Sequence, residues 1–321
     1  MPYYPPQSEK PSDPPASGNS SRRRIILRRA AVLVSLLLIV YGAVRLIGYG
    51  SDLIASRQTT QELRNLAAET DVPTETAPSA GPATDLPAPE TEGPAAPPAD
   101  EPEEAPAGSD TLPVVDYPNG YKLVSRIQKL RKKSEYIIGW ITMDGLDEPV
   151  ALKDNSFFLN HDATGKRNGN GAVFMDEDTS LLTRPYTILL YGHNMKNGAM
   201  FSNLRKYEDF SYCYRHRVFQ FDTLYEEGQY VIFAVETISL TPGKNRYVSL
   251  AELQSSDRKT RRKALKALTD HSLHDSMLDV NEADQILLLV TCTGDDDERL
   301  IVAARRLRDG EQPDHLAIKG K

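Results

Sequence analysis

The hydrophobic pattern of this chain begins with one long apolar segment near the N-terminus. Residues 30–44 are uncharged and mostly aliphatic, and the apolar character continues beyond Arg45 to residue 50. These 21 positions, with Arg45 as an end residue whose charge reaches the surface, match the ~20 residues that a helix needs to cross a bilayer. Five arginines lie between residues 22 and 29, and such charge marks the cytoplasmic side. We expect a transmembrane signal anchor at 22–50 and a disordered cytoplasmic tail at 1–21.

A cleaved signal peptide is the alternative for this segment. Its apolar core would be about 7–15 residues long and would end at a small-residue cleavage site. The uncharged core here is at that upper limit, and residues 53–55 (LIA) make a poor cleavage site. An uncleaved anchor, with the rest of the chain outside the membrane, is therefore favoured.

Composition separates the anchor from a folded domain. Residues 71–113 hold eleven of the 22 prolines, ten acidic residues and no Lys or Arg. Such a segment buries too little apolar surface to offset its ordering entropy. We expect a stalk and a disordered Pro/acidic linker at 51–116, then a folded extracellular domain at 117–321. Without the ten linker acids the formal charge changes from −7 to +3, which excludes a strongly basic nucleic-acid binder.

Within the folded domain, the pattern predicts one helix, then short strands. Leu123, Ile127 and Leu130 have helical spacing, and a later helical interruption begins at the capping-box sequence of residues 249–252. That interruption carries a basic face, which is interpreted as solvated, with contact to anionic lipid or wall polymer as the alternative: Arg258, Lys259, Arg261, Arg262, Lys263 and Lys266. The fold class is mainly β, as a barrel or a sandwich. Eight β-rich runs are predicted at 137–141, 149–152, 171–174, 186–191, 218–222, 229–240, 285–292 and 300–307.

Candidate chemistry lies at the end of the seventh run. If residues 285–292 and 299–306 form a hairpin, Cys292 and Arg299 flank its turn as near-opposite positions. A cation near a thiol favours the nucleophilic thiolate, and an arginine can also stabilise an oxyanion. The alternatives are that Cys292 is a small buried hydrophobe and that Arg299 pairs with an acid of the turn.

His193 is the candidate base. It follows an apolar run and Gly192 and precedes a polar loop, a place that suits access rather than packing, and histidine is the side chain that most often transfers protons near neutral pH. Cys213 is interpreted as structural, without a disulfide to Cys292. No metal site is expected, because no His or Cys pair has diagnostic spacing, and the acidic turn at 295–298 is better explained by solvation than by calcium. The remaining histidines are interpreted as surface residues: His161, His216, His271, His274 and His315.

Three stretches of sequence resemble the sortase family, specifically class B. They are YGHNMKNGAMFSNLRKY at 191–207, VTC at 290–292 with Arg299 seven residues later, and residues 137–178, which resemble the family's N-terminal strands. The helical interruption lies where class B enzymes carry a long helix. One departure is Val290, where the family has a hydroxyl residue two positions before the cysteine. No Asp-Pro-aromatic lid precedes the domain, which argues against class C.

The resemblance implies an eight-stranded sortase-like β-barrel with an N-terminal helix and a long helical insertion before the cysteine strand. It implies a membrane-anchored cysteine transpeptidase with no cofactor, whose partners are secreted proteins with a C-terminal sorting signal and a peptidoglycan amine. His193, Cys292 and Arg299 would be catalytic. A pilin-polymerising enzyme and a non-catalytic wall-binding module are the alternatives. The residues that would line the substrate groove are Asn155, Leu159, Tyr191 and Thr291.

Overall fold

The structure is a computed structural model that describes residues 19–68, 110–195, 198–276, 278–293, 297–313, 316 and 318–320. Contacts divide the chain into two units, Met1–Ser51 and Asp52–Lys321. The predicted tail at 1–21 lies outside the described residues except for its last three positions. The predicted linker lies outside them from residue 69 to residue 109.

Helix α1 (Asn19–Ala68) carries the apolar segment of the first unit. Its aliphatic side chains are exposed there, as at Leu37 and Leu46. Ala31–Ala68 is the one helix in the described part of the chain that is long and apolar enough to cross a membrane. This helix is compatible with the predicted anchor.

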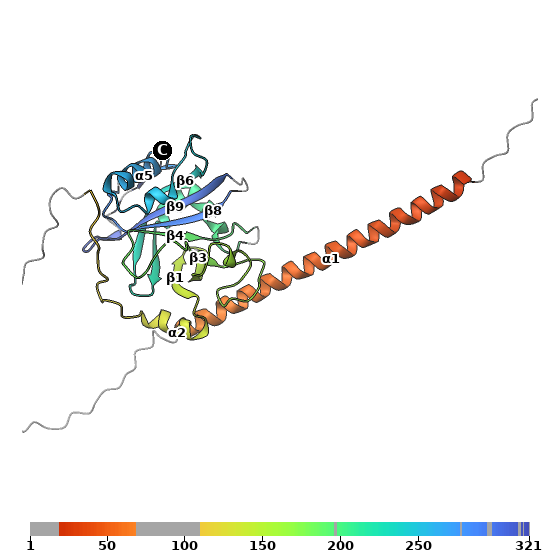
Figure 1. Ribbon diagram of the computed structural model, residues 1–321, viewed down its shortest axis with the longest axis horizontal. Helices are drawn as coiled ribbons and strands as arrows, with labels where there is room; N and C mark the ends of the chain where they lie inside the picture. Colours follow the sequence, from red (N-terminus) through yellow and green to blue (C-terminus); the bar gives the residue numbers. More distant parts are fainter. Residues whose placement is uncertain are drawn as a thin grey trace, which may run out of the picture. The chain divides into compact units, whose positions relative to one another are not determined.

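The second unit is built on a closed β-barrel (Figure 1). Its strand order is β1-β2-β3-β4-β8-β9-β6-β5, and the pairing of β1 with β5 closes it. The strands are β1 (Ile137–Met143), β2 (Leu146–Ala151), β3 (Val173–Met175), β4 (Thr187–Tyr191), β5 (Val218–Thr223), β6 (Gln229–Ser239), β8 (Ile286–Cys292) and β9 (Glu298–Arg306).

The predicted eight-stranded barrel is confirmed, and the sandwich is excluded because the sheet has no free edge. Each predicted run overlaps one barrel strand. Most neighbouring pairs are antiparallel, whereas β2 pairs with β3 and β4 with β8 in parallel. The parallel β4–β8 pair matters for function, because the segments that follow these two strands leave the barrel at the same end.

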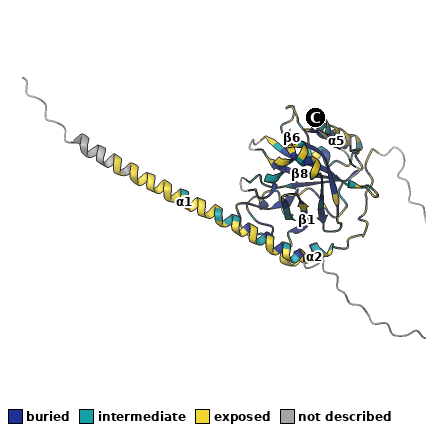
Figure 2. Cartoon of the chain, turned by 180° about the vertical axis from the view of Figure 1, so that it is seen from behind, coloured by how far each residue is buried: buried dark blue, intermediate teal, exposed yellow. Residues whose placement is uncertain are grey.

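Alternation along β8 gives the barrel two cores. Leu287 and Leu289 pack with the cluster that fills the barrel, whereas Leu288 and Val290 pack with a second cluster that includes Leu268. Successive side chains of a strand point to opposite faces, so β8 is apolar on both sides. Figure 2 shows this burial concentrated on the strands of the barrel.

Helices cover the outside of this barrel. The predicted N-terminal helix is α2 (Ser125–Lys133), and the helical insertion precedes the cysteine strand as expected. The insertion is two helices rather than one, because Ser249 caps α4 by accepting from the Glu252 amide and Asp257 caps α5 by accepting from the Thr260 amide. The remaining elements are η1 (Phe157–Leu159), η2 (Phe201–Glu208), α3 (Phe210–Arg215), α4 (Leu250–Leu253), α5 (Arg258–Asp270), β7 (His274–Ser276) and β10 (Ile318–Gly320).

Two assignments of polar residues to the surface are wrong. Arg261 is fully buried instead of lying on a solvated basic face, and its guanidinium donates to the oxygens that surround it. His274 is also buried, and its Nε2 lies 2.8 Å from the Tyr207 carbonyl oxygen. His315 lies outside the described residues. The Arg261 acceptors are the carbonyls of Tyr186, Leu253, Glu282 and Asp284 and the Thr187 hydroxyl.

The predicted stalk is not a separate element over residues 52–68. This part of α1 belongs to the same compact unit as the barrel. Its buried positions, Ser56, Thr60, Leu63 and Ala67, follow helical spacing, and Leu63 and Ala67 share a core cluster with Trp140. The folded unit therefore begins at Asp52 and not at residue 117.

Candidate active site

Three barrel strands bring the predicted catalytic residues to one end. In the β8–β9 hairpin Cys292 pairs with Arg299, which is the register expected from the sequence. In the parallel β4–β8 pair Tyr191 lies opposite Val290. His193 and Cys292 are each two residues beyond that pair, so they leave adjacent strands in the same direction.

Strand alternation also places these side chains on one face. Leu189, Val290 and Ile301 belong to the cluster outside the barrel. Tyr191, Cys292 and Arg299 lie two residues from them on β4, β8 and β9 respectively, and residues two apart point the same way. The outer face of the barrel therefore changes from apolar packing to reactive groups as these strands end.

A groove of about 360 Å³ opens at this position. It contains every residue for which the sequence predicted a catalytic or substrate-binding role. Apolar side chains from β3, β6, β8 and α4 or their flanks supply much of the rest of its wall, as is usual for a binding site with a few polar groups. The lining residues are Asn155, Leu159, Phe174, Tyr191, Gly192, His193, Leu240, Leu250, Val290, Thr291, Cys292 and Arg299.

The two cysteines have opposite environments. Cys292 is an exposed free thiol at the groove, whereas Cys213 is a buried free thiol, so they form no disulfide. Burial raises the pKa of the Cys213 thiol to about 12, which keeps it protonated and unreactive. The prediction that Cys213 is structural is thus confirmed.

The backbone around Cys292 is held by residues that the sequence did not single out. Asn194 donates through Nδ2 to the Cys292 carbonyl oxygen at 2.8 Å. Arg205 donates to the carbonyl oxygen of Thr293 at 2.6 Å. Both bonds join the segment after β4 to the end of β8, so the strand that carries the thiol is tied to the segment that carries His193.

His193 is half-buried and oriented by a carbonyl group. Its Nε2 lies 2.8 Å from the Leu159 carbonyl oxygen, so in the neutral ring Nε2 carries the hydrogen and Nδ1 is the basic nitrogen. Two glycines make room for this arrangement. A Cβ at Gly171 would lie 3.1 Å from the His193 ring, and one at Gly192 would lie 2.8 Å from the Phe201 ring.

A buried carboxylate holds the polar residues of the groove. Asp176 accepts from Asn155 Nδ2 at 3.1 Å and is hydrogen-bonded to the Tyr191 hydroxyl. Burial, reinforced by this carboxylate, raises the pKa of the Tyr191 phenol, which therefore stays neutral. The Asn155 side-chain oxygen accepts from the Glu177 amide at 3.0 Å. Asp176 was missed because nothing local in the sequence marks it.

Arg299 and Thr291 differ in what they present to the groove. Arg299 is half-buried, donates to its neighbour's carbonyl, that of Glu298, at 2.8 Å, and its positive charge acts on the Tyr191 phenol. Thr291 is buried, and its hydroxyl donates to the Gly192 carbonyl oxygen at 2.7 Å. Thr291 therefore joins β8 to β4 just before His193.

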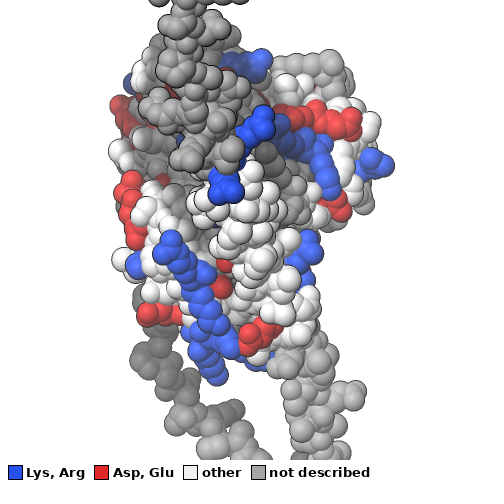
Figure 3. All heavy atoms as spheres, turned by 90° about the vertical axis from the view of Figure 1, so that its right-hand side faces the viewer, with Lys and Arg blue, Asp and Glu red and all other residues white. Residues whose placement is uncertain are grey.

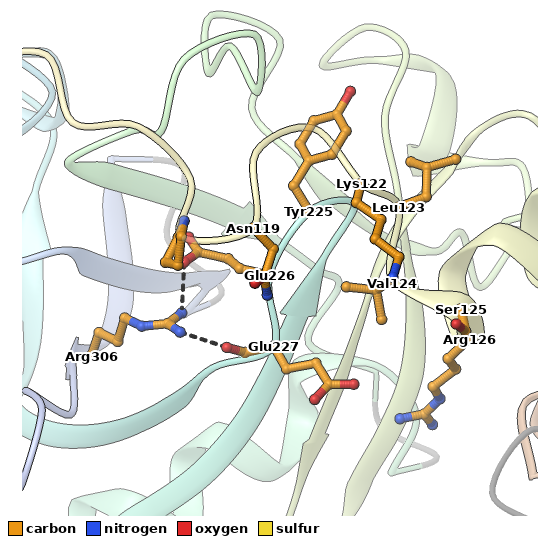
Figure 4. Close-up of a pocket in the computed structure, with 11 residues that line it drawn as sticks. Asn119, Lys122, Leu123, Val124, Ser125, Arg126, Tyr225, Glu226, Glu227 and Arg306 are labelled. Carbon is orange, nitrogen blue, oxygen red and sulfur yellow. Dashed lines mark hydrogen bonds and ion pairs between the residues drawn. The ribbon is translucent and has the colours of Figure 1, made fainter. Parts of the chain in front are cut away.

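A larger cavity of about 750 Å³ lies at the other end of β9 (Figure 4). Arg306 points toward Glu226 and Glu227 there, with its guanidinium 3.3 Å from a Glu226 oxygen. None of the residues that line it is a cysteine or a histidine. On the face of the molecule shown in Figure 3, basic and acidic side chains are interspersed rather than gathered by sign.

The groove has the parts needed for acyl transfer by a thiol. An exposed cysteine supplies a nucleophile, a histidine can move a proton, and an arginine can stabilise an oxyanion. Among the described residues no group of three His, Cys, Asp or Glu side chains is arranged to hold a metal. The turn at residues 294–296, part of the acidic loop, lies outside them.

Known proteins share both the sequence and the fold. Residues 145–307 match the sortase domain family. Sortase B of Listeria monocytogenes is 28% identical over 174 residues, which are 53% of this chain and 68% of the relative. Sortase B of Staphylococcus aureus is 27% identical over 189 residues, which are 57% of this chain and 75% of the relative.

Solved structures agree with these relatives. A Bacillus anthracis protein similar to sortase B has 29% identity and a TM-score of 0.52, over 61% of this chain and 88% of that chain. A Staphylococcus aureus sortase B–substrate complex has 25% identity and a TM-score of 0.52, over 58% of this chain and 87% of that chain. The family match spans half of the chain and these relatives are all of class B, so the chain belongs to the sortase family, as a class B cysteine transpeptidase.

Proposed function

We propose that this enzyme cleaves a C-terminal sorting signal of the Asn-Pro-x-Thr type after the threonine and transfers the protein to a peptidoglycan amine. The observation that carries the proposal is the pairing of Cys292 with Arg299 at a groove that His193 also lines. The signal type and the wall acceptor follow the resemblance to class B enzymes.

The proposed reaction has two acyl-transfer steps. The Cys292 thiolate attacks the carbonyl carbon of the threonine, and Arg299 stabilises the negative oxygen that forms. His193 gives a proton to the leaving amine, so the peptide bond breaks and a thioester to Cys292 remains. The acceptor amine then attacks the thioester and loses a proton to His193. A new amide bond forms and the thiolate is regenerated.

The groove residues have different roles in this proposal. Leu159 and Tyr191 contact the signal peptide, and Asn155 presents the amide hydrogen that is not used by Asp176. Thr291 positions the strand rather than contacting the peptide, since its hydroxyl donates to the Gly192 carbonyl oxygen. Val290 leaves the groove wall apolar at the position where the family has a hydroxyl residue.

The same proposal places the catalytic unit outside the cell. The arginines that precede the apolar segment support a cytoplasmic N-terminus. An enzyme anchored in this way meets both secreted substrates and lipid-linked wall precursor.

The test uses the compact unit Asp52–Lys321, since a fragment starting near residue 116 would lose the core side chains Leu63 and Ala67. Cleavage of quenched fluorescent Asn-Pro-x-Thr and Leu-Pro-x-Thr peptides is measured for the wild type. The same measurement is made for the variants Cys292→Ala, His193→Ala and Arg299→Ala. We expect cleavage of the first peptide and its loss in all three variants. No cleavage of either peptide, with a Cys292 that resists alkylation, would leave a wall-binding module as the better explanation.

The acceptor is tested separately. Products formed with a wall-type peptide amine and with a lysine peptide of the pilin type are compared by mass spectrometry. Transfer to the wall amine supports the proposal, whereas transfer to the lysine peptide alone supports pilin polymerisation.

A further inference from the structure

The part of α1 that belongs to the compact unit begins at a turn of the barrel. Asp52, the first residue of that unit, accepts from the Gly169 amide through Oδ2 at 3.1 Å. Its carbonyl oxygen accepts from Asn168 Nδ2 at 2.9 Å. Asn168 is buried, and its side-chain oxygen accepts from the Asn170 amide at 2.9 Å. The turn at 168–171 is thus held to the helix by two bonds to Asp52, one from the Gly169 backbone and one from the Asn168 side chain.

The other end of this turn touches the residues that orient His193. Gly171 has a φ of +66°, and a Cβ there would lie 2.4 Å from the Phe158 carbonyl oxygen and 3.2 Å from that of Leu159. The next amide, that of Ala172, donates to the Phe158 carbonyl at 3.0 Å. The Leu159 carbonyl is the group that lies 2.8 Å from His193 Nε2. A shift of the turn therefore displaces the acceptor that sets the ring's orientation and tautomer.

The helix itself is fixed against the barrel beyond Asp52. Thr60 donates to Glu148 at 2.8 Å, and Leu63 and Ala67 are buried in a core cluster. Thr59 donates to Asp162 at 3.4 Å. These contacts hold the part of α1 that follows Asp52 against the barrel, so that Asp52 can act as a fixed acceptor rather than a mobile surface carboxylate.

We propose that Asp52 is a positioning residue for the reaction, which acts through the turn at 168–171 and the Leu159 carbonyl on His193. The proposal rests on the proton-transfer role given above to His193. Asp52 touches neither substrate nor thiol. Its contribution is to keep the imidazole in the orientation that presents Nδ1, and misplacement of a catalytic group is costly in rate even when binding is unchanged.

The experiment uses the full-length chain in detergent micelles and the signal peptide that the wild type cleaves. Asp52→Ala removes the acceptor of the Gly169 amide, Asp52→Asn keeps an acceptor oxygen without the charge, and Glu62→Ala is the matched control on the same helix. Glu62 is exposed and pairs with Lys133, away from the turn. His193→Ala is the reference for complete loss of the histidine.

We expect Asp52→Ala to lower kcat roughly tenfold with KM within about twofold. Asp52→Asn should restore kcat to within about twofold of wild type, and Glu62→Ala should leave both constants unchanged. A kcat for Asp52→Ala equal to that of Glu62→Ala overturns the proposal, and so does an equal loss in Asp52→Asn. If His193→Ala itself keeps wild-type activity, the proposed function is wrong. That result is distinguishable from an unexpected result in Asp52→Ala or Asp52→Asn.

Discussion

The two ends of strands β8 and β9 use the same kinds of charged residue in different ways. At the groove end, Arg299 faces a thiol across the hairpin and lines an open, largely apolar cavity. At the opposite end, Arg305 is buried and makes two hydrogen bonds to Glu311, while Arg306 pairs with Glu226, which also binds Arg184. At the opposite end the charged side chains pair with one another, whereas at the groove end Arg299 lines an open cavity. Changes at the opposite end should therefore alter stability, and changes at the groove end should alter activity.

Arg261 tests the opposite end, where its loss should destabilise the fold most. It lies beside the starts of β4 and β8, where its guanidinium donates to four carbonyls and a hydroxyl. Arg261→Met leaves these buried acceptors without a donor, and we expect the free energy of unfolding to fall by about 3–4 kcal/mol. Denaturant unfolding measures this, and kcat per folded molecule should not change.

Lys266→Met is the matched control on the same helix. Lys266 is exposed and pairs with Asp270 one turn away, an interaction with a contribution of about 0.3–0.5 kcal/mol. A fall in kcat of folded Arg261→Met would contradict the division between the two ends, because it would make the opposite end part of the catalytic apparatus.

The same substitution, Arg to Lys, made at both ends of β9 should have different effects at the two ends. Arg299→Lys keeps the charge but loses the planar fork that can hold an oxyanion, so we expect kcat/KM to fall about 100-fold with little change in stability. Arg306→Lys should weaken the pair with Glu226 and lower stability by about 1 kcal/mol, with activity within about twofold of wild type. Peptide cleavage and thermal unfolding are measured for both. Similar activities in the two variants would argue that Arg299 acts only as a charge.

The same division explains what the sequence could predict. Apolar runs bounded by turn residues predict the eight strands, and hairpin geometry predicts that Cys292 faces Arg299, because these depend on neighbours in the chain. Arg261 has the pattern of a surface residue, since only its distant partners make it buried. Asp176 and Asn194 are likewise defined by residues far away in sequence. The docked part of α1 was missed because its buried stripe contains Ser56 and Thr60, which give no hydrophobic signal.

Glu148 is a partly buried carboxyl at the contact between α1 and the barrel, and it tests whether the division between the two ends extends to that contact. Thr60 donates to it from α1, and it lies close to Gly171 and Met200. Burial raises the pKa of the Glu148 carboxyl from 4.5 to about 7, against the Thr60 hydrogen bond and the Arg64 charge, which lower it, and with the Asp147 charge, which raises it further.

Because folding raises the pKa of this carboxyl, the free energy of unfolding decreases as the pH rises. Below pH 4.5 the group is protonated in both states, and between 4.5 and about 7 the unfolded state loses its proton first. Stability therefore falls as pH rises through this window, by up to about 3 kcal/mol, and stays lower above it. Glu148→Gln keeps an acceptor for Thr60 without a charge, so it should remove this part of the dependence and be more stable than wild type at pH 8.

Unfolding of wild type and Glu148→Gln at pH 5 and pH 8 measures the effect, and peptide cleavage at both values accompanies it. If only stability changes, Glu148 has a structural role, and the contact between α1 and the barrel does not act on catalysis. If kcat follows the same titration, the contact between α1 and the barrel acts on catalysis, as the role of Asp52 would lead one to expect. Equal pH dependence in the two proteins would show that Glu148 is ionised in the folded enzyme and that its burial does not oppose charge.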